Sequence, residues 1–135
     1  MAVLGVGSLG QHHAKHYAGL AREGVVDFVG LYDADTARAK TIAAKYNVPV
    51  LASVGAAIAA AEALNVVTPT FTHFDLASEI LRSGRHVLVE KPMTDTTVQA
   101  AELVRLAREN KCVLQVGHIE RFNPVFDYLQ NVARE

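Results

Sequence analysis

The sequence has few of the features that mark a secreted, membrane-bound or nucleic-acid-binding protein. Its 135 residues contain one cysteine, Cys112, which excludes an internal disulfide framework and fits a reducing compartment. No apolar run approaches the ~20 residues of a membrane span, and the first residues lack the pattern of a signal peptide. Thirteen basic and fourteen acidic residues leave a formal net charge of −1, so no basic surplus favours nucleic acid or an anionic membrane. We therefore expect a cytoplasmic protein with neither as a partner.

Strand and helix patterns alternate from one end of the chain to the other. Strands are predicted at residues 2–6, 25–32, around 50, 64–67, 85–89 and 112–116. Helices are predicted at residues 8–22, 36–46, 53–61, 72–84, from 94 or 95 to about 111, and from 123 onward. Strands separated by helices predict an α/β domain, a doubly wound parallel sheet of about six strands with helices on both faces.

Polar residues mark the starts of three of these helices. Thr72 and Asp75 have the spacing of a capping box, and Thr94 or Asp95 is the expected N-cap of the helix that follows. Asn123 before Pro124 is typical of an N-cap and the first helical position.

A glycine-rich run, Gly5-Val6-Gly7-Ser8-Leu9-Gly10, follows the first predicted strand and opens the first predicted helix. In such a run the first glycine permits a tight turn, the second lets the backbone approach a pyrophosphate, and the third lets helix and strand pack closely. The start of the helix then presents free N–H groups to the phosphates. This placement predicts a dinucleotide site.

An acidic residue supports this prediction. Asp33 ends the second predicted strand. Its distance along the chain from Gly10 is near the ~20 residues expected for the carboxylate that binds the adenine ribose. Such a carboxylate accepts hydrogen bonds from a 2′-hydroxyl and repels a 2′-phosphate, and the first basic residue after it is Arg38. We therefore favour NAD over NADP as cofactor. The alternative is that Asp33 only caps the next helix, since Asp is a preferred N-cap.

Polar residues also follow the later predicted strands, where ligands of open parallel sheets bind. These groups are Thr68-Pro69-Thr70 with His73, Glu90-Lys91-Pro92, and Gly117-His118 with Glu120 and Arg121. A carboxylate can bind the nicotinamide ribose, and a lysine can polarise or help deprotonate a hydroxyl as hydride leaves. The alternative for Lys91 is a residue that merely precedes a turn-forming proline.

These motifs together resemble the Gfo/Idh/MocA oxidoreductases, whose N-terminal half is an NAD(P)-binding Rossmann domain. The resemblance rests on the glycine run with His13, on Thr68-Pro69, on residues 116–124 and above all on Glu90-Lys91-Pro92. It extends over essentially the whole chain. It is greatest to members that act on sugars or nucleotide sugars, such as the UDP-N-acetylglucosamine 3-dehydrogenases.

The resemblance implies a role for each candidate site residue, and Lys91 would be catalytic, touching the substrate hydroxyl. The pyrophosphate would bind to the backbone of Gly5, Val6, Gly7, Ser8, Leu9 and Gly10, and the adenosine ribose to Asp33. The cofactor groove would be lined by Thr68, Pro69 and His73, and the nicotinamide ribose would contact Glu90 and Lys91. The substrate or nicotinamide pocket would be bordered by His118 and Arg121. His13 would lie near the phosphates. For Arg121, a surface arginine without a ligand is the equal alternative.

The resemblance also implies a second domain. Residues 1–120 would form the dinucleotide-binding domain, and residues 121–135 would begin the connection to a C-terminal substrate domain that this chain does not include. We expect the apolar side chains of Phe122, Val125, Phe126 and Leu129 to face that missing structure. The resemblance further implies a homo-oligomer, a dimer or tetramer.

The leading functional hypothesis is an NAD-dependent dehydrogenase that transfers hydride between nicotinamide and a secondary alcohol of a sugar or nucleotide sugar. The alternatives are a non-catalytic NAD-binding module or redox sensor, and a domain for another nucleotide such as coenzyme A. His12 and His16 share a helical face, but no third ligand stands at metal-binding spacing, so no metal site is expected.

Overall fold

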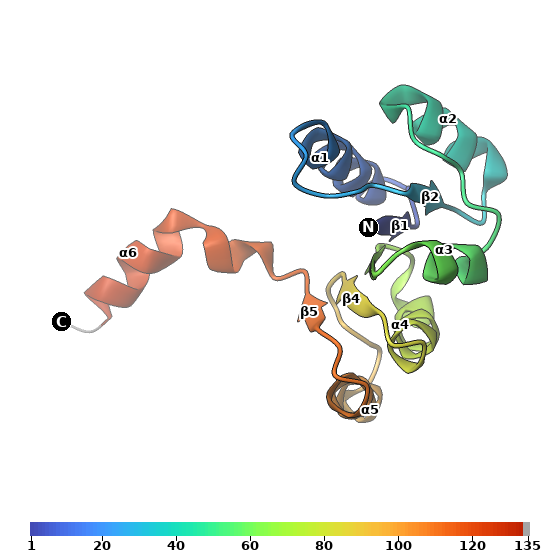
Figure 1. The fold of residues 1–135 in the computed structure, drawn as a ribbon. Coiled ribbons are helices and arrows are strands. Elements are labelled where there is room, and N and C mark those ends of the chain that lie inside the picture. The colour runs from blue at the N-terminus through green and yellow to red at the C-terminus, as the bar shows by residue number, and fades with distance from the viewer. Residues whose placement is uncertain (134–135) are drawn as a thin grey trace.

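The computed structural model describes residues 1–133, so the last two residues of the predicted 121–135 connection lie outside the described residues. The chain folds into one α/β body from which the C-terminal helix projects (Figure 1). The elements in chain order are β1 (Ala2–Leu4), α1 (Gly10–Arg22), β2 (Gly30–Tyr32), α2 (Thr36–Tyr46), α3 (Val54–Ala60), β3 (Ala63–Val66), the 3-10 helix η1 (Thr70–Thr72), α4 (His73–Arg82), β4 (His86–Val89), α5 (Thr97–Glu109), β5 (Leu114–Val116), the 3-10 helix η2 (Ile119–Phe122) and α6 (Pro124–Val132).

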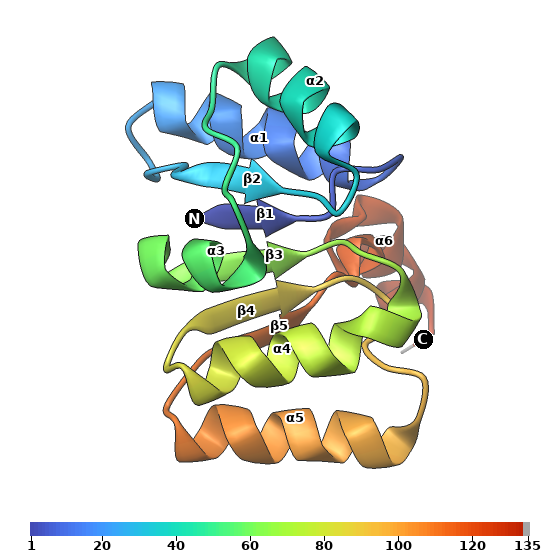
Figure 2. The same cartoon turned by 90° about the vertical axis from the view of Figure 1, so that its right-hand side faces the viewer.

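The strands form one parallel sheet in the order β2-β1-β3-β4-β5. All the arrowheads point to the same edge in Figure 2. The chain crosses from β2 at one edge to β3 on the other side of β1, so the order reverses between β1 and β3. This confirms the predicted doubly wound sheet, and in such sheets the point of reversal is where ligands bind.

The sheet has five strands rather than the predicted six. Around Val50 the chain forms only an isolated bridge to Leu31, with one hydrogen bond from Leu31 N–H to Pro49 O and one from Leu51 N–H to Leu31 O. Pro49 has no N–H to donate, and α3 begins shortly afterwards. The predicted strand is therefore reduced to a single pairing.

Helices cover the two faces of the sheet with separate apolar clusters. Val3 and Leu31 belong to the cluster under α1 and α2, whereas Leu4 and Val66 belong to the cluster under α3, α4 and α5. Adjacent residues of β1 contribute to different clusters because successive side chains of a strand point to opposite faces. This is why the strand reads as a continuous apolar run.

Some helix boundaries and capping residues predicted from the sequence are confirmed, and others are wrong. The helix predicted at residues 36–46 has those bounds, and Asn123 caps α6 by accepting a hydrogen bond from Val125 N–H. The predicted capping box at Thr72 was wrong, because the turn η1 leads directly into α4 and the Thr72 hydroxyl bonds to Thr68 and to Pro69 O instead. The caps predicted at residues 94 or 95 were wrong as well, since Thr96 caps α5.

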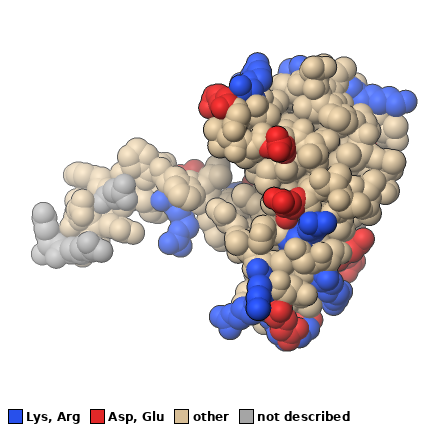
Figure 3. Space-filling view, viewed as in Figure 1, with Lys and Arg blue, Asp and Glu red and all other residues tan. Residues whose placement is uncertain are grey.

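The segment of η2 and α6 stands away from the body of the domain (Figure 1). Its apolar side chains are exposed, among them Phe122 at 81% and Tyr128 at 68%. None of the helices formed by residues 1–133 has the length and apolar character needed to span a bilayer. On the face shown in Figure 3, acidic and basic side chains are interspersed over the body.

Candidate functional site

A cleft of about 780 Å³ opens at the carboxyl edge of the sheet, where β1, β2 and β3 end. It is bounded by the glycine run after β1, the residues after β2 and the turn after β3. Its lining includes Gly5, Gly7, Ser8, Tyr32, Asp33, Ala34, Arg38, Val67, Thr68, Pro69, Phe71, Thr72 and Asp75. The structure thus brings together at the topological switch point residues that lie far apart in the sequence.

The three glycines of the run differ in what surrounds them. Gly5 has φ +83°, and a Cβ there would lie 2.7 Å from Val67 O. A Cβ on Gly10 would lie 1.9 Å from Gly5 O, so the start of α1 packs directly on the preceding turn. A Cβ on Gly7 would meet only the guanidinium of Arg38, at 3.9 Å. The protein itself therefore leaves the space at Gly7 open towards the cleft.

The N-terminus of α1 supplies hydrogen-bond donors beside this open space. Leu9, at the N-cap position, makes no side-chain capping bond. Within residues 1–133 the backbone N–H groups of Ser8 and Leu9 donate no hydrogen bond, and both residues are exposed. Unpaired N–H groups at the positive end of a helix dipole bind phosphate groups. The loop therefore has the donors and the space that a pyrophosphate requires.

Asp33 lies beside the loop with its carboxylate held in place. Oδ2 accepts a hydrogen bond from Val6 N–H at 2.8 Å, and Oδ1 accepts one from Asp35 N–H at 2.9 Å. Asp35, rather than Asp33, caps α2 by accepting the Arg38 N–H at 3.0 Å. The alternative that Asp33 serves as the helix cap is therefore wrong.

Arg38 is a cleft residue that the sequence analysis did not include in the site. Its guanidinium lies 3.4 Å from both oxygens of Asp33 and 3.2 Å from Asp35 Oδ2, although the side chain is about half exposed. The sequence did offer one indication of this contact. Arg38 lies one helical turn after Asp35, the N-cap of α2, and this spacing brings its side chain back to the end of β2.

The turn after β3 contains Thr68 and Pro69 at the surface of the cleft and His73 beneath it. His73 is 1% exposed. Its Nε2 lies 2.8 Å from Thr68 O and its Nδ1 lies 2.9 Å from Pro92 O. His73 thus supports the cleft by joining the turn after β3 to the turn after β4.

Glu90 and Lys91 follow β4. Glu90 is 5% exposed, its Oε1 lies 3.0 Å from His13 Nε2, and its Oε2 accepts Lys91 N–H at 3.1 Å. A Cβ on Gly117 would lie 2.7 Å from Oε1, so glycine at this position allows the carboxylate to rest against the backbone after β5. The Lys91–Pro92 peptide bond is cis, and the Lys91 residue is exposed.

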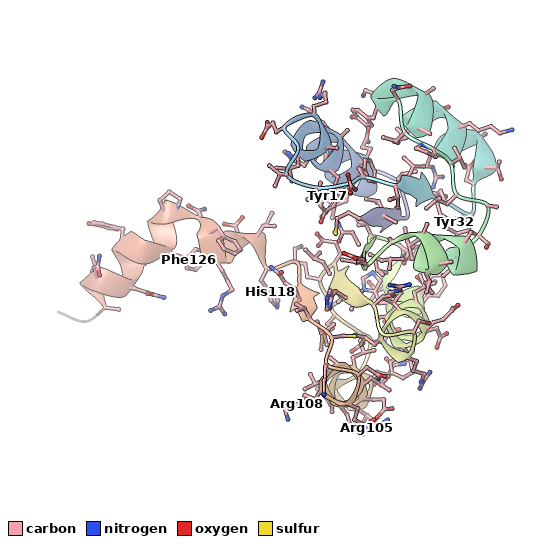
Figure 4. All side chains as sticks on the ribbon, in the orientation of Figure 1. Tyr17, Tyr32, Arg105, Arg108, His118 and Phe126 are labelled. Carbon is pink, nitrogen blue, oxygen red and sulfur yellow. The ribbon has the colours of Figure 1, made fainter. Side chains whose placement is uncertain are left out.

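A second hollow of about 490 Å³ lies where the chain leaves β5. It is lined by Lys91, His118, Ile119, Glu120, Arg121, Phe126 and Gln130. Figure 4 shows His118 after β5 and Phe126 on α6. The residues predicted for the substrate pocket therefore share one hollow with Lys91. Among residues 1–133, no three His, Cys, Asp or Glu side chains are grouped as a metal site would need.

The ring of His13 bonds to Glu90 on one side and to Asn65 Nδ2, 2.6 Å from Nδ1, on the other. Asn65 is fully buried in β3. Asn65 is not among the residues predicted from the sequence, and its one available signal was a polar residue within an otherwise apolar strand.

Comparison with protein-family models matches residues 1–118 to an oxidoreductase family with an NAD-binding Rossmann fold. A UDP-N-acetylglucosamine 3-dehydrogenase from Acidithiobacillus ferrooxidans is 39% identical over 131 residues, 97% of this chain and 40% of that protein. An inositol 2-dehydrogenase from Rhizobium meliloti is 34% identical over 126 residues, 92% of this chain and 37% of that protein.

Solved structures agree with these matches. The structure of UDP-N-acetylglucosamine 3-dehydrogenase GnnA from Acidithiobacillus ferrooxidans aligns with a TM-score of 0.88 and 38% identity, over 97% of this chain and 40% of that chain. GenD2 from gentamicin A biosynthesis, solved in complex with NAD, aligns with a TM-score of 0.78 and 32% identity, over 86% of this chain and 33% of that chain. The present chain thus spans about 40% or less of the length of these relatives.

Proposed function

This chain belongs to the Gfo/Idh/MocA family of NAD-binding oxidoreductases, and from that membership we propose that it is the cofactor half of an NAD-dependent dehydrogenase. The proposal rests on the groups that lie together at the carboxyl edge of the sheet. There the open space at Gly7, Ser8 and the carboxylate of Asp33 line a single cleft, and within residues 1–133 the backbone N–H groups of Ser8 and of the next residue, Leu9, donate no hydrogen bond. These groups suit a pyrophosphate and an adenosine ribose, and Lys91 lies beyond β4 on the same edge.

The roles of the individual residues follow from this arrangement. The backbone of residues 5–10 would hold the pyrophosphate, and Asp33 would accept hydrogen bonds from the adenosine ribose. Thr68 and Pro69 would form the wall of the groove, with His73 supporting it from beneath. Glu90 would accept a hydrogen bond from the nicotinamide ribose, because a carboxylate has more acceptor sites than His13 and Lys91 N–H occupy.

When bound, nicotinamide would supply the hydride chemistry, and the chain's own contribution centres on Lys91. The ammonium of Lys91 can donate a hydrogen bond to a substrate hydroxyl and stabilise negative charge that develops on its oxygen as the proton leaves. His118 and Arg121 share its hollow and would contact the substrate. The cytoplasm, where NAD is available, is the proposed location.

Asp33 and Arg38 act in opposite directions on the choice between NAD and NADP. The Asp33 carboxylate repels a 2′-phosphate, whereas the Arg38 guanidinium attracts one. Two backbone N–H groups fix Asp33 at the end of β2, while Arg38 is about half exposed and can turn towards solvent. We therefore infer a preference for NAD that Arg38 reduces.

The substrate and the assembly are inferred from the relatives. The relatives named above include dehydrogenases for UDP-N-acetylglucosamine and for inositol, so a secondary alcohol of a sugar or nucleotide sugar is the proposed substrate class. Residues 121–135 would begin the connection to a substrate domain, which fits the outward direction and exposed apolar side chains of α6. The intact protein would be a homo-oligomer.

Calorimetric titration with NAD⁺ and NADP⁺ tests the cofactor assignment. We expect NAD⁺ to bind more tightly than NADP⁺, Asp33→Ala to narrow the difference, and Arg38→Ala to widen it. Each effect should be about tenfold in affinity, which corresponds to about 1.4 kcal/mol. Binding of coenzyme A with no response to either dinucleotide would reject the proposal in favour of a different nucleotide ligand.

Turnover of the full-length protein tests catalysis. Lys91→Ala should leave the affinity for NAD⁺ nearly normal and lower kcat by a factor of about 10² or more, with Lys40→Ala on the outer side of α2 as a matched control. Equal turnover in the Lys91 variant and the control would exclude the catalytic role. NAD⁺ binding without oxidation of any sugar alcohol would favour a non-catalytic module or redox sensor.

A further inference from the structure

A chain of hydrogen bonds joins three elements beneath the nicotinamide end of the proposed site. Asn65 of β3 lies 2.6 Å from His13 Nδ1, His13 Nε2 lies 3.0 Å from Glu90 Oε1, and Glu90 Oε2 accepts the Lys91 N–H. Asn65 is fully buried, and the side chains of His13 and Glu90 are 19% and 7% exposed. The dinucleotide-binding helix α1 is thereby joined to the residue proposed to act on the substrate.

The order of donors and acceptors defines the form of the His13 ring. Asn65 Nδ2 is a donor, so His13 Nδ1 accepts, and the ring hydrogen is on Nε2, which donates to the Glu90 carboxylate. Asn65 Oδ1 is buried and has no hydrogen-bond partner among residues 1–133. If the amide rotated by half a turn, this oxygen would face Nδ1 and accept a hydrogen from a protonated ring. The network can therefore hold His13 in either protonation state.

Resting on the dehydrogenase function proposed above, we propose that His13 is a positioning residue that orients Glu90 and sets the net charge presented to the nicotinamide. With a neutral His13 ring, Glu90 retains an uncompensated negative charge that favours the cationic ring of NAD⁺ over the neutral ring of NADH. When His13 gains a proton, the two residues form an ion pair and that preference is lost. Acid should thus weaken NAD⁺ binding relative to NADH binding.

The surroundings of His13 place this change on the acid side of neutrality. Burial lowers the pKa of His13 from its usual range, and the neighbouring Glu90 carboxylate offsets this only in part. The other titratable or charged neighbours are His12 and His16 on the same helix, which also lower the pKa of His13, and Lys91, whose backbone N–H bonds to Glu90. Asn65, the contact from β3, does not titrate. At neutral pH the ring is therefore uncharged.

The test is the ratio of the dissociation constants of NAD⁺ and NADH from pH 5 to pH 8, measured on the full-length protein. We expect this ratio to rise by about five- to tenfold towards acid pH, the effect of one unit charge in a partly screened site. His13→Gln, which can still donate a hydrogen bond to Glu90 but does not titrate, should make the ratio independent of pH. His12→Asn, which changes an exposed histidine on the same helix, should leave the pH dependence intact.

A measurement on the unmodified protein supplements the variants. Nitrogen-15 NMR of the histidine rings should show His13 with its hydrogen on Nε2, and its titration midpoint should coincide with that of the ratio. A ratio that stays constant in the wild type, or still varies in His13→Gln, overturns the inference and leaves the proposed function standing. Failure of the wild type to bind either form of the cofactor overturns the proposed function and the inference together.

Discussion

Glycines that look equivalent in the sequence differ in what surrounds them. A Cβ at Gly10 would overlap the Gly5 carbonyl oxygen, whereas a Cβ at Gly7 would project into the cleft and meet no backbone atom. Gly10 is therefore needed for the packing of the chain, and Gly7 is needed only if something binds beside it. Substitutions at Gly10 should therefore affect the stability of the fold, and substitutions at Gly7 should affect ligand binding.

We expect Gly7→Ala to leave the free energy of unfolding within about 0.5 kcal/mol of the wild type and to weaken NAD⁺ binding by about tenfold or more. Gly10→Ala should instead lower the free energy of unfolding by about 1–3 kcal/mol, because the added methyl group overpacks the turn. Urea denaturation and calorimetry measure the two quantities. Loss of stability in Gly7→Ala comparable to that in Gly10→Ala would show that the open space is structural.

His13 also makes stability depend on pH. Since burial lowers the pKa of His13 in the folded protein below its ordinary value of 6.5, the unfolded chain takes up a proton at a higher pH than the folded protein does. The free energy of unfolding should therefore be fully supported above about pH 6.5 and fall as pH drops through the folded pKa. Urea midpoints from pH 5 to 8 measure this slope. The slope should become shallower in His13→Gln and stay unchanged in His12→Asn; an unchanged slope in His13→Gln would refute the assignment.

The candidate site was predictable where neighbouring residues define it. The glycine run and the carboxylate after β2 are local patterns, and the fold brings them to one cleft as the motif requires. The contact of His13 with Glu90 was not predictable, because 77 positions separate the two residues and only the packing of α1 on the sheet brings them together. Arg38 was not predicted for a related reason. The sequence shows only that Arg38 follows the second strand, and not that its side chain turns back towards the end of that strand.

The starts of the helices show how far local signals reach. Three hydroxyl or carboxylate side chains stand close together before α5, at Thr94, Asp95 and Thr96, and each is an acceptable cap by composition. The structure selects Thr96, whose Oγ1 accepts Gln99 N–H at 3.2 Å, while the Thr94 hydroxyl donates to Thr96 O. The conformation of the turn before α5 therefore determines which of the three side chains caps the helix.

Thr96→Ala should consequently lower the free energy of unfolding by about 1 kcal/mol, the usual cost of losing a cap. Asp95→Ala serves as the control, because Asp95 makes no side-chain hydrogen bond to any residue from 1 to 133, and its effect should be within about 0.5 kcal/mol. Thermal and urea denaturation compare the two. A larger loss in Asp95→Ala would restore the sequence-based assignment of the cap.

The overall architecture followed from the alternation of strand and helix patterns, which predicted the parallel doubly wound sheet. The position of α6 did not follow, since an amphipathic pattern indicates that a helix has an apolar face and not what covers it. In the structure the apolar side chains of η2 and α6 are exposed, among them Phe122 of η2 and Tyr128 and Leu129 of α6. Exposed apolar side chains of this kind favour association.

The chain of residues 1–135 should therefore associate in solution with increasing concentration. Replacing Phe122 and Tyr128 together by Ser should shift it towards monomer, whereas Val98→Ser on α5 should not, although Val98 is 79% exposed. Size-exclusion chromatography with light scattering measures the mass of each. A monomeric wild-type chain at high concentration, or equal association of all variants, would contradict the role of the apolar side chains of η2 and α6.

The opposite edge of the sheet has a consequence for engineering. There the chain turns from helix to strand through residues with left-handed φ, among them Gly24, Gly84 and Lys111, all of which are exposed. None of these three turns lines the cleft at the carboxyl edge. Affinity tags, fluorescent reporters or fused partner domains inserted at these turns would thus be separated from the cleft by the full length of the strands.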